Sequence, residues 1–326
     1  MPQTIRIATF NMENLEDGPK AKPPLDVRAA LMQPQLLRLN ADLLCVQEIN
    51  SPSALNTLIA GTPYAPYQQF ATTNDPARNH GVPQNVVLLS RFPITQGEQV
   101  LHQFIKGPVY QIQTAIPPAT APQAMTWTRS ILHAQVTLPG NRPLHVVSMH
   151  LKSKLPSNIP GQKESVPGSK FGRWKSASAY AEGAFISSML RMGQALEARQ
   201  LVDSIFNADP NGLVVVCGDF NAETSEVPVE ALRGDVENTD NPVLATRVLV
   251  PCEQSVPESA RYSLFHHGKG IMIDHILVSR ALLAFYRGTE IHNEVLHDES
   301  SAFATDVKFP ESDHAPVVAT FELPDA

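Results

Sequence analysis

The chain is poor in cysteine, in aromatic residues and in basic charge. Its 326 residues include three cysteines, and aromatic residues make up 6% of the total. An odd number of cysteines, with Cys45 and Cys217 inside apolar runs, argues against a disulfide framework. The 25 Lys and Arg residues against 32 Asp and Glu residues give a formal charge of −7. This balance disfavours a protein that holds nucleic acid on a broad basic face, so any polyanion must be bound locally.

Long hydrophobic runs are also missing. No apolar run approaches the roughly 20 residues of a membrane-spanning helix, and the first residues, MPQTIRIATFNME, lack the charged head and apolar stretch of a signal peptide. We therefore expect no membrane span and a cytoplasmic location. Export stays open, because a signal removed before residue 1 would leave the same sequence. The composition, 43% hydrophobic and 17% charged, is typical of a globular protein, and no obligate protein partner is evident.

Short strand-like runs recur along the whole chain, and helical patterns are fewer. We expect helices at Asp26–Leu39, with a restart at Pro34 as an alternative, and at Ala184–Phe206. Several strands follow one another without a helix between them, which disfavours an alternating doubly wound fold and favours two packed sheets flanked by helices. No repeat or linker divides the chain, so we expect one domain over residues 1–326. The expected strands are Ile5–Phe10, Leu43–Gln47, Tyr67–Ala71, Asn85–Leu89, Ser130–Leu138, Leu144–His150, Leu213–Cys217, Met272–Val278 and Val317–Phe321.

The valine-rich run Leu213–Cys217 leads into Gly-Asp-Phe-Asn. Because side chains alternate along a strand, Asp219 and Asn221 would project to the same side at its carboxyl end. One reading is an ordinary exit from a strand, in which Asp and Asn bond to the backbone of a turn. The other is that these two side chains belong to a site.

Polar residues also end or follow other apolar runs: Asn11, Glu48, His150, Asp274 and the pair Asp313-His314. Each has a structural explanation when it is taken alone, as an exposed strand end, a half-buried imidazole or a turn cap. Together they suggest that the strand ends converge on one site for a hard cation and for proton transfer.

Six motifs, in this order, resemble the endonuclease/exonuclease/phosphatase superfamily: TFNMENL, QEI, MHLKSK, GDFN, IDHILVS and SDHAPV. They run from Thr9 to Val317, nearly the whole chain. The superfamily includes pancreatic-type deoxyribonucleases, apurinic endonucleases, neutral sphingomyelinases and inositol polyphosphate phosphatases. The resemblance implies a four-layered α/β/β/α sandwich of two mixed sheets, with one active-site rim built by loops from both sheets.

The resemblance also implies hydrolysis of phosphate esters with Mg²⁺ or Mn²⁺ as cofactor. Glu48 would bind the metal ion, with Asn11 as a neutral oxygen partner and Asp313 available to the ion or its waters. Asp219 would orient and deprotonate the attacking water. Asn221 would donate a hydrogen bond to a phosphate oxygen.

Further roles follow from the same resemblance. His314 would neutralise the charge that develops near the phosphorus atom, and Asp274 would accept a hydrogen bond from its ring. His150 matches a second histidine of the deoxyribonuclease and sphingomyelinase branches, where it would protonate the leaving oxygen. Arg129 stands where several members place a phosphate contact. His275 adjoins Asp274 and must point to the opposite face of the strand, so we expect a packed or solvated side chain rather than a zinc ligand.

A basic segment stands apart from the rest of the chain. Residues 152–176, KSKLPSNIPGQKESVPGSKFGRWKS, carry one acidic residue and six basic ones: Lys152, Lys154, Lys163, Lys170, Arg173 and Lys175. One reading is a solvated surface insertion. The other is a strap that meets phosphate, with Lys170 and Arg173 as substrate contacts and Phe171 and Trp174 available for stacking.

The substrate is narrowed by one further resemblance. The stretch RYSLFHHGKGIMIDHILVS and the long insertion after HLKSK are similar to bacterial extracellular-nuclease-like members. We therefore expect a metal-dependent phosphodiesterase of nuclease type, with nucleic acid as one candidate substrate. The alternatives are a phosphomonoesterase, a sphingomyelinase-type phospholipase, or a catalytically silent binding module of the same fold.

Overall fold

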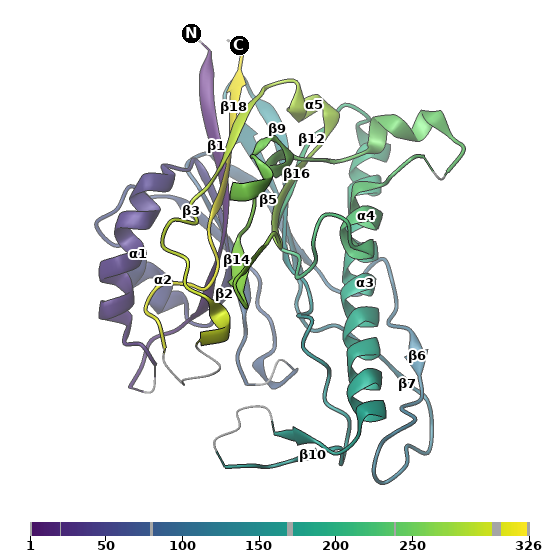
Figure 1. The fold of residues 1–326 in the computed structure, drawn as a ribbon. Coiled ribbons are helices and arrows are strands. Elements are labelled where there is room, and N and C mark those ends of the chain that lie inside the picture. The colour runs from purple at the N-terminus through teal and green to yellow at the C-terminus, as the bar shows by residue number, and fades with distance from the viewer. Residues whose placement is uncertain are drawn as a thin grey trace.

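Two mixed β-sheets of six strands each, packed face to face, form the centre of the computed structural model (Figure 1). It describes residues 2–19, 21–78, 81–167, 172–237, 239–301 and 308–324. The first sheet has the order β17 (Tyr286–Ile291), β18 (Val317–Leu323), β1 (Gln3–Leu15), β2 (Leu43–Ile49), β4 (Asn85–Ser90) and β3 (Gln68–Ala71). In it β1 and β2 are parallel and the other neighbours are antiparallel.

The second sheet repeats this plan. Its order is β13 (Val250–Pro251), β16 (Asp274–Val278), β12 (Leu213–Asp219), β9 (Arg142–His150), β8 (Ile131–Leu138) and β5 (Ile94–Val100). The parallel pair is β9 and β12, and the remaining pairs are antiparallel. Each sheet therefore has one parallel pair near its middle.

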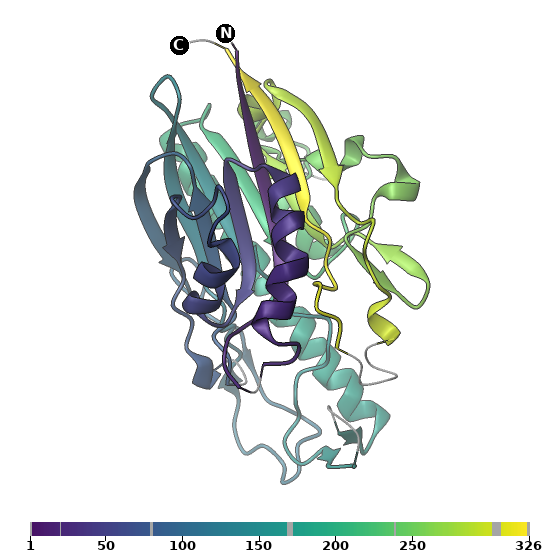
Figure 2. The same ribbon diagram turned by 90° about the vertical axis from the view of Figure 1, so that its left-hand side faces the viewer.

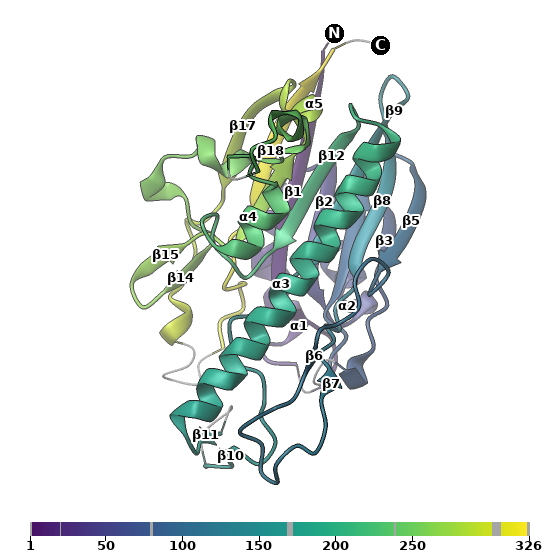
Figure 3. The ribbon, with the colours of Figure 1, turned by 90° about the vertical axis from the view of Figure 1, so that its right-hand side faces the viewer.

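The alternation of side chains along β12 shows how the layers are built. Val215 and Cys217 belong to the core between the two sheets, whereas Val214 and Val216 pack into the core beneath the outer helices. The outer layer on the second sheet is α3 (Ala177–Ala208) with α4 (Val227–Arg233). On the first sheet it is α1 (Leu25–Leu39) with α2 (Pro52–Ile59). Figures 2 and 3 show these two faces, and the expected four-layered sandwich is confirmed.

Two helix expectations need correction. The helix α1 runs without interruption through Pro34, so the alternative of a restart there was wrong. The helix α3 begins at Ala177 and not at Ala184, with the Ser176 side chain accepting a hydrogen bond from Ala179 N as its N-cap. The first turns of α3 extend past the sheet, so they do not carry the apolar stripe that marks the later turns (Figure 3).

All nine expected strands are present, but three edge strands of the two sheets were missed. They are β5, with the sequence ITQGEQV, β17, with the sequence YRGTEI, and the two-residue β13. The two longer ones lie at the edges of their sheets, where β5 is largely exposed and β17 half-buried to exposed, so polar residues and glycine replace the apolar run that revealed the inner strands.

An extension of α3 lies beyond the sandwich. We use the name α3 extension for the first turns of α3 with two short hairpins, β6 (Val109–Tyr110) with β7 (Gln123–Ala124) and β10 (Lys163–Glu164) with β11 (Arg173–Trp174). It has a small core of its own, made of Ile112, Ala115, Met125, Ile159 and Ile186. Figures 1 and 3 show it below the strand ends, beside the lower half of α3.

The remaining elements are short. A third hairpin joins β14 (Leu264–His266) and β15 (Lys269–Ile271), α5 covers Arg280–Leu283, and 3₁₀ turns lie at Pro76–Arg78, Pro242–Arg247, Cys252–Ser255 and Glu258–Ala260. Within the described ranges, no helix combines the length and the apolar character that crossing a bilayer requires.

Candidate active site

The strand register of the second sheet places three of the expected site residues side by side on neighbouring strands. Asp219, the last residue of β12, pairs with His150 at the end of β9 and with Asp274 at the start of β16. Gly218 just before it has φ +139°, and a Cβ atom there would collide with the carbonyl oxygen of Met149. Only glycine lets β12 approach β9 this closely.

Asp219 lies at the centre of the group and is buried. Its Oδ2 accepts hydrogen bonds of 3.0 Å from Asn11 Nδ2 and from Asn221 Nδ2, and it lies 3.3 Å from His150 Nε2. Its Oδ1 accepts a 2.8 Å bond from Asn221 N. Burial, opposed by the positive charge of His314 and assisted by Asp274, raises the pKa of Asp219 to about 7. A carboxylate with this pKa can gain or lose a proton near neutral pH.

His314 is held by Asp274 and faces the same space. Its Nδ1 donates to Asp274 Oδ2 at 2.7 Å, and its Nε2 lies 4.0 Å from Asp219 Oδ2 and 3.9 Å from Asp313 Oδ1. Burial alone would lower the pKa of His314, but the three carboxylates raise it well above its usual value. His314 is therefore an imidazolium whose second N–H is directed at the cluster.

Glu48 enters from the first sheet. Its backbone is left-handed, with φ 60°, and its Oε2 accepts a 2.8 Å bond from Asn14 N. Its Oε1 lies 3.4 Å from Asn11 Nδ2 and 3.6 Å from His150 Nε2. The Asn11 oxygen is engaged elsewhere, because Asn11 Oδ1 accepts a 3.0 Å bond from Glu13 N. Asn11 therefore turns its amide nitrogen, and not the oxygen expected for a cation, toward the carboxylates.

Several polar atoms of the cluster have no protein partner. Within the described part of the chain, Asp274 Oδ1, Asp313 Oδ1 and His150 Nδ1 are buried and make no hydrogen bond. Burial also raises the pKa of Asp313 to about 6. Unpaired buried carboxylate oxygens are costly unless a cation or a proton satisfies them, so the donor set fits a hard divalent cation.

Two sets of residues could hold such an ion. Ligand atoms of Asp219, Asp274 and His314 lie within 4.8 Å of one another. The imidazolium state of His314 disfavours this set, because a protonated ring nitrogen cannot ligate a metal ion. Glu48 Oε1 and Asp313 Oδ1 lie 3.6 and 3.9 Å from the nearest histidine nitrogen, beyond hydrogen-bonding distance, so these two carboxylates suit Mg²⁺ or Mn²⁺ better.

Arg129 is half-buried beside the cluster. Its Nε and Nη2 donate to Gln84 Oε1 at 3.1 and 2.6 Å, and its Nη1 donates to Leu151 O at 2.8 Å. Burial and the positive charge of Arg129 hold the pKa of His150 well below its usual value. His150 is therefore neutral at pH 7 in this arrangement, and it can donate a hydrogen bond but is a poor acid.

Sequence reasoning missed Arg28, which braces the site from behind. Its guanidinium is buried and donates to Met12 O at 2.7 Å, Glu13 O at 2.9 Å and Pro310 O at 3.1 Å. It thereby joins the segment after Asn11 to the segment before Asp313. No signal in the sequence separates this arginine from the exposed Arg38 on the same helix.

The His275 side chain is packed in the interior, which is one of the two roles expected for it. Its Nδ1 lies 2.5 Å from Glu253 Oε1, its Nε2 lies 2.9 Å from Ala222 O, and both side chains are fully buried. Burial alone would lower the pKa of His275, and the carboxylate of Glu253 outweighs it and raises that pKa. The His275 ring thereby fastens β16 to the turn that carries Glu253 and to Ala222, the residue after Asn221.

The basic segment is structured and partly paired. Arg173 is 72% exposed and pairs with Glu164 at 2.8 Å, Lys154 Nζ lies 2.5 Å from Glu226 Oε2, and Lys163 Nζ lies 4.5 Å above the Trp174 ring. Lys170 lies outside the described residues. Arg173 is thus turned toward Glu164 on the surface of the α3 extension, and not into the strand-end cluster.

Comparisons with known proteins bear on the family and on the fold. The sequence profile of the Endonuclease/Exonuclease/phosphatase family matches residues 8–314. Truncated Caenorhabditis elegans TDP2 is similar in structure, with a TM-score of 0.57 and 15% identity over 98% of each chain. An endonuclease/exonuclease/phosphatase family protein from Bacteroides thetaiotaomicron has the same TM-score, with 13% identity over 99% of this chain and 96% of that one. D. rerio TDP2 complexed with a single-strand DNA product gives a TM-score of 0.54, with 18% identity over 98% of each chain. No curated protein sequence matches this chain.

Proposed function

The chain belongs to the endonuclease/exonuclease/phosphatase family, and from that premise we propose that it is a divalent-metal-dependent phosphodiesterase of nuclease type. The observation that carries the proposal is the group around Asp219. One carboxylate with a pKa of about 7 lies 4.0 Å from an imidazolium and within hydrogen-bonding distance of two amide nitrogens. A base, a cation and donors around one space are what in-line attack on phosphorus requires.

In this proposal Glu48 and Asp313 hold Mg²⁺ or Mn²⁺. When bound, the ion supplies positive charge to a nonbridging phosphate oxygen. Asp313 Oδ1, buried and without a hydrogen bond among the described residues, is the atom that most needs such a partner.

Asp219 accepts the proton of the attacking water. The two amides on its Oδ2 and the backbone N–H of Asn221 on its Oδ1 fix the carboxylate plane, so the acceptor site that remains is the second lone pair of Oδ1. His314 holds its Nε2–H toward the same space and balances the charge that develops on the phosphoryl oxygens. Asp274 fixes the direction of that ring and stabilises its charge, as an orienting acid does in a triad.

His150 acts as a neutral hydrogen-bond donor. Its Nε2 already faces Asp219 and Glu48 at 3.3 and 3.6 Å. Because its pKa is depressed, the ring is neutral near pH 7 and holds no imidazolium proton to transfer, so we assign it to donating a hydrogen bond to the leaving oxygen or to the base rather than to protonating the leaving oxygen. Arg129 adds fixed positive charge and positions Leu151 O, which also accepts a 3.1 Å bond from Asn221 Nδ2.

A diester is favoured over a monoester or a sphingolipid by two features. The motifs RYSLFHHGKGIMIDHILVS and HLKSK are similar to extracellular-nuclease-like members, and D. rerio TDP2, which shares the fold, was captured with a single-strand DNA product. The α3 extension, which Figure 1 shows below the strand ends, carries the exposed Arg173 and adds positive charge on that side for a polyanion.

The test is a substrate panel measured with Mg²⁺, with Mn²⁺ and with a chelator. It comprises single-stranded DNA, plasmid DNA, RNA, bis-p-nitrophenyl phosphate, p-nitrophenyl phosphate and sphingomyelin. We expect cleavage of a nucleic acid and of the synthetic diester, abolished by the chelator. Cleavage of the monoester alone or of sphingomyelin alone would replace the diester assignment. No cleavage, together with a melting temperature that millimolar Mg²⁺ leaves unchanged, would indicate a silent binding module.

A further inference from the structure

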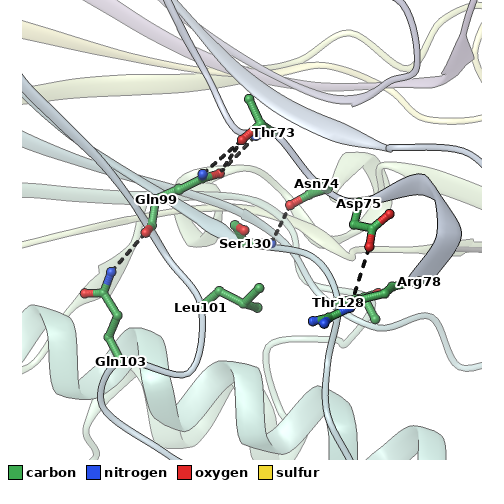
Figure 4. Close-up of a pocket in the computed structure, with 9 residues that line it drawn as sticks. All are labelled: Thr73, Asn74, Asp75, Arg78, Gln99, Leu101, Gln103, Thr128 and Ser130. Atoms are coloured by element: carbon green, nitrogen blue, oxygen red, sulfur yellow. Dashed lines mark hydrogen bonds and ion pairs between the residues drawn. The ribbon is translucent and has the colours of Figure 1, made fainter.

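A polar pocket opens beside the candidate active site. Its volume is about 250 Å³, and its walls include Asn74, Arg78, Leu101, Gln103 and Ser130 (Figure 4). Pockets for drug-sized ligands measure about 300–1,000 Å³, so this one suits a smaller group. None of the roles assigned above uses it.

The pocket lies at the same end of the molecule as the catalytic cluster. Val100, the last residue of β5, pairs with Ile131, and Leu132 pairs with Ser148, two residues before His150. Residues 101–103 and 128–130 therefore lie at the rim of the second sheet. Thr73 and Asn74 follow β3 and approach from the first sheet.

A chain of hydrogen bonds connects the pocket wall to Asp219. Asn74 Oδ1 accepts a 2.9 Å bond from Ser130 N, and Asn74 Nδ2 donates to Gln84 O at 3.2 Å. The Gln84 side chain accepts from Arg129, and Arg129 and Asn221 both donate to Leu151 O. Arg129 does not line the pocket itself, but its neighbours Thr128 and Ser130 do, so the segment that carries Arg129 to the cluster also forms one wall of the pocket.

The lining suits a neutral, planar, hydrogen-bonding group. The Gln103 side chain lines the pocket and donates from its Nε2 to Gln99 O at 3.0 Å, so its amide oxygen is left without a hydrogen bond among the described residues. Leu101 supplies an apolar surface, and amide side chains pair with the edges of nucleobases. Arg78 is 69% exposed, and its Nε lies 3.6 Å from Asp75 Oδ2, so its terminal N–H groups can reach a base face or a second phosphate.

We propose that this pocket is a nucleoside subsite, which takes the base and sugar next to the scissile phosphate. This inference rests on the proposed function, because it gives that phosphodiester a nucleoside substituent. It makes the enzyme selective for nucleic acid or nucleotide diesters over simple alkyl or aryl diesters.

Kinetics on two diesters test the subsite. Thymidine 5′-(p-nitrophenyl phosphate) carries a nucleoside, and methyl p-nitrophenyl phosphate does not. The quantity compared is kcat/KM for the nucleoside ester divided by kcat/KM for the methyl ester. For Gln103→Leu and Arg78→Met we expect this ratio to fall by about 5- to 20-fold, which corresponds to the loss of one or two hydrogen bonds. The matched control is Gln96→Leu, an exposed glutamine on β5 outside the pocket, which should leave the ratio unchanged.

A binding experiment separates the subsite from the reaction. Calorimetry with thymidine 5′-monophosphate should show binding to the wild-type chain and at least 5-fold weaker binding to Gln103→Leu and Arg78→Met, whether or not any ester turns over. Equal binding to wild type and variants, or no binding to wild type, overturns the subsite. The two proposals can fail separately. If the wild-type chain hydrolyses neither ester but still binds the nucleotide more tightly than the two pocket variants do, the subsite stands and the proposed hydrolase activity is wrong.

Discussion

The strand-end cluster and the α3 extension both carry many charged groups, but they hold them differently. In the cluster, Asp219, Asp274 and His314 are buried and bonded across 40 or more residues of sequence. In the extension, Arg173 and Glu164 are exposed and nine residues apart. Buried charges are expensive and shift one another's pKa, whereas exposed pairs are screened by water and salt. Chemistry therefore belongs to the cluster, and the extension can contribute to the capture of a polymer.

The strongest way to break this comparison is to neutralise the cluster. Asp219→Asn keeps the shape but removes the proton acceptor and one of the two accepting oxygens, so we expect kcat to fall by about 10³-fold. Because burial already raises the pKa of Asp219 to about 7, removing the charge offsets part of the lost hydrogen bond, and the free energy of unfolding should change by less than about 2 kcal/mol. The measurements are initial rates on the synthetic diester and thermal unfolding. Asp203→Asn on α3, where the carboxylate pairs with Arg199 at the surface, is the control, and equal activity of wild type and Asp219→Asn would remove the assigned base.

The pH dependence of stability tests whether the buried pair His275–Glu253 is charged. Glu253→Gln should lower the free energy of unfolding by about 3–5 kcal/mol at pH 6, because it strands a buried imidazolium. The folded pKa of His275 lies above its unfolded value of 6.5, so the stabilisation is complete below pH 6.5 and is lost as pH rises through the folded pKa. The difference between wild type and variant should shrink accordingly in urea unfolding series.

The exposed pair His133–Glu98 serves as the matched control for that experiment. Its nitrogen and oxygen lie 2.8 Å apart, but the glutamate side chain is 51% exposed. Glu98→Gln should change stability by less than about 1 kcal/mol. A pH-independent difference for Glu253→Gln, or a loss no larger than that of Glu98→Gln, would show that the buried pair is not charged.

The smallest effect is expected in the α3 extension. Arg173→Glu with Lys175→Glu should raise KM for single-stranded DNA by about 3- to 10-fold and reduce its salt dependence by about 0.7 in slope per lost phosphate contact. Hydrolysis of a small diester should not respond. The control is the charge reversal Arg280→Glu with Arg287→Glu. These two residues lie on α5 and β17, at the end of the molecule opposite the α3 extension (Figure 3). If both double variants behave alike, the segment is a solvated insertion.

Much of the fold was predictable from the sequence, and the reason lies in burial. Inner strands such as β12 contact a helix layer on one face and a second sheet on the other, so their apolar runs are unmistakable. The edge strand β5 and the first turns of α3 bury little surface and carry no such pattern. The family was also recognised correctly from six motifs, and the profile match over residues 8–314 confirms it.

The residues of the candidate site also differ in how far the sequence alone predicts them. Which residues end the strands could be read directly, because alternation and strand length place Asp219, His150 and Glu48 at carboxyl ends. The partners of those residues could not. Arg28, Glu253 and Gln84 are ordinary polar residues on a helix, a turn and a loop, and only the packed chain shows that they brace the site.

The sequence by itself determined the layers and the identity of the polar groups at the strand ends, since both follow from local periodicity and from which side chains can be buried. The tertiary structure alone decided how those groups behave. It turned the Asn11 nitrogen inward, made His314 cationic and His150 neutral, and built a pocket from three separated segments. These properties depend on distances and burial between residues far apart in the chain, which no local pattern specifies.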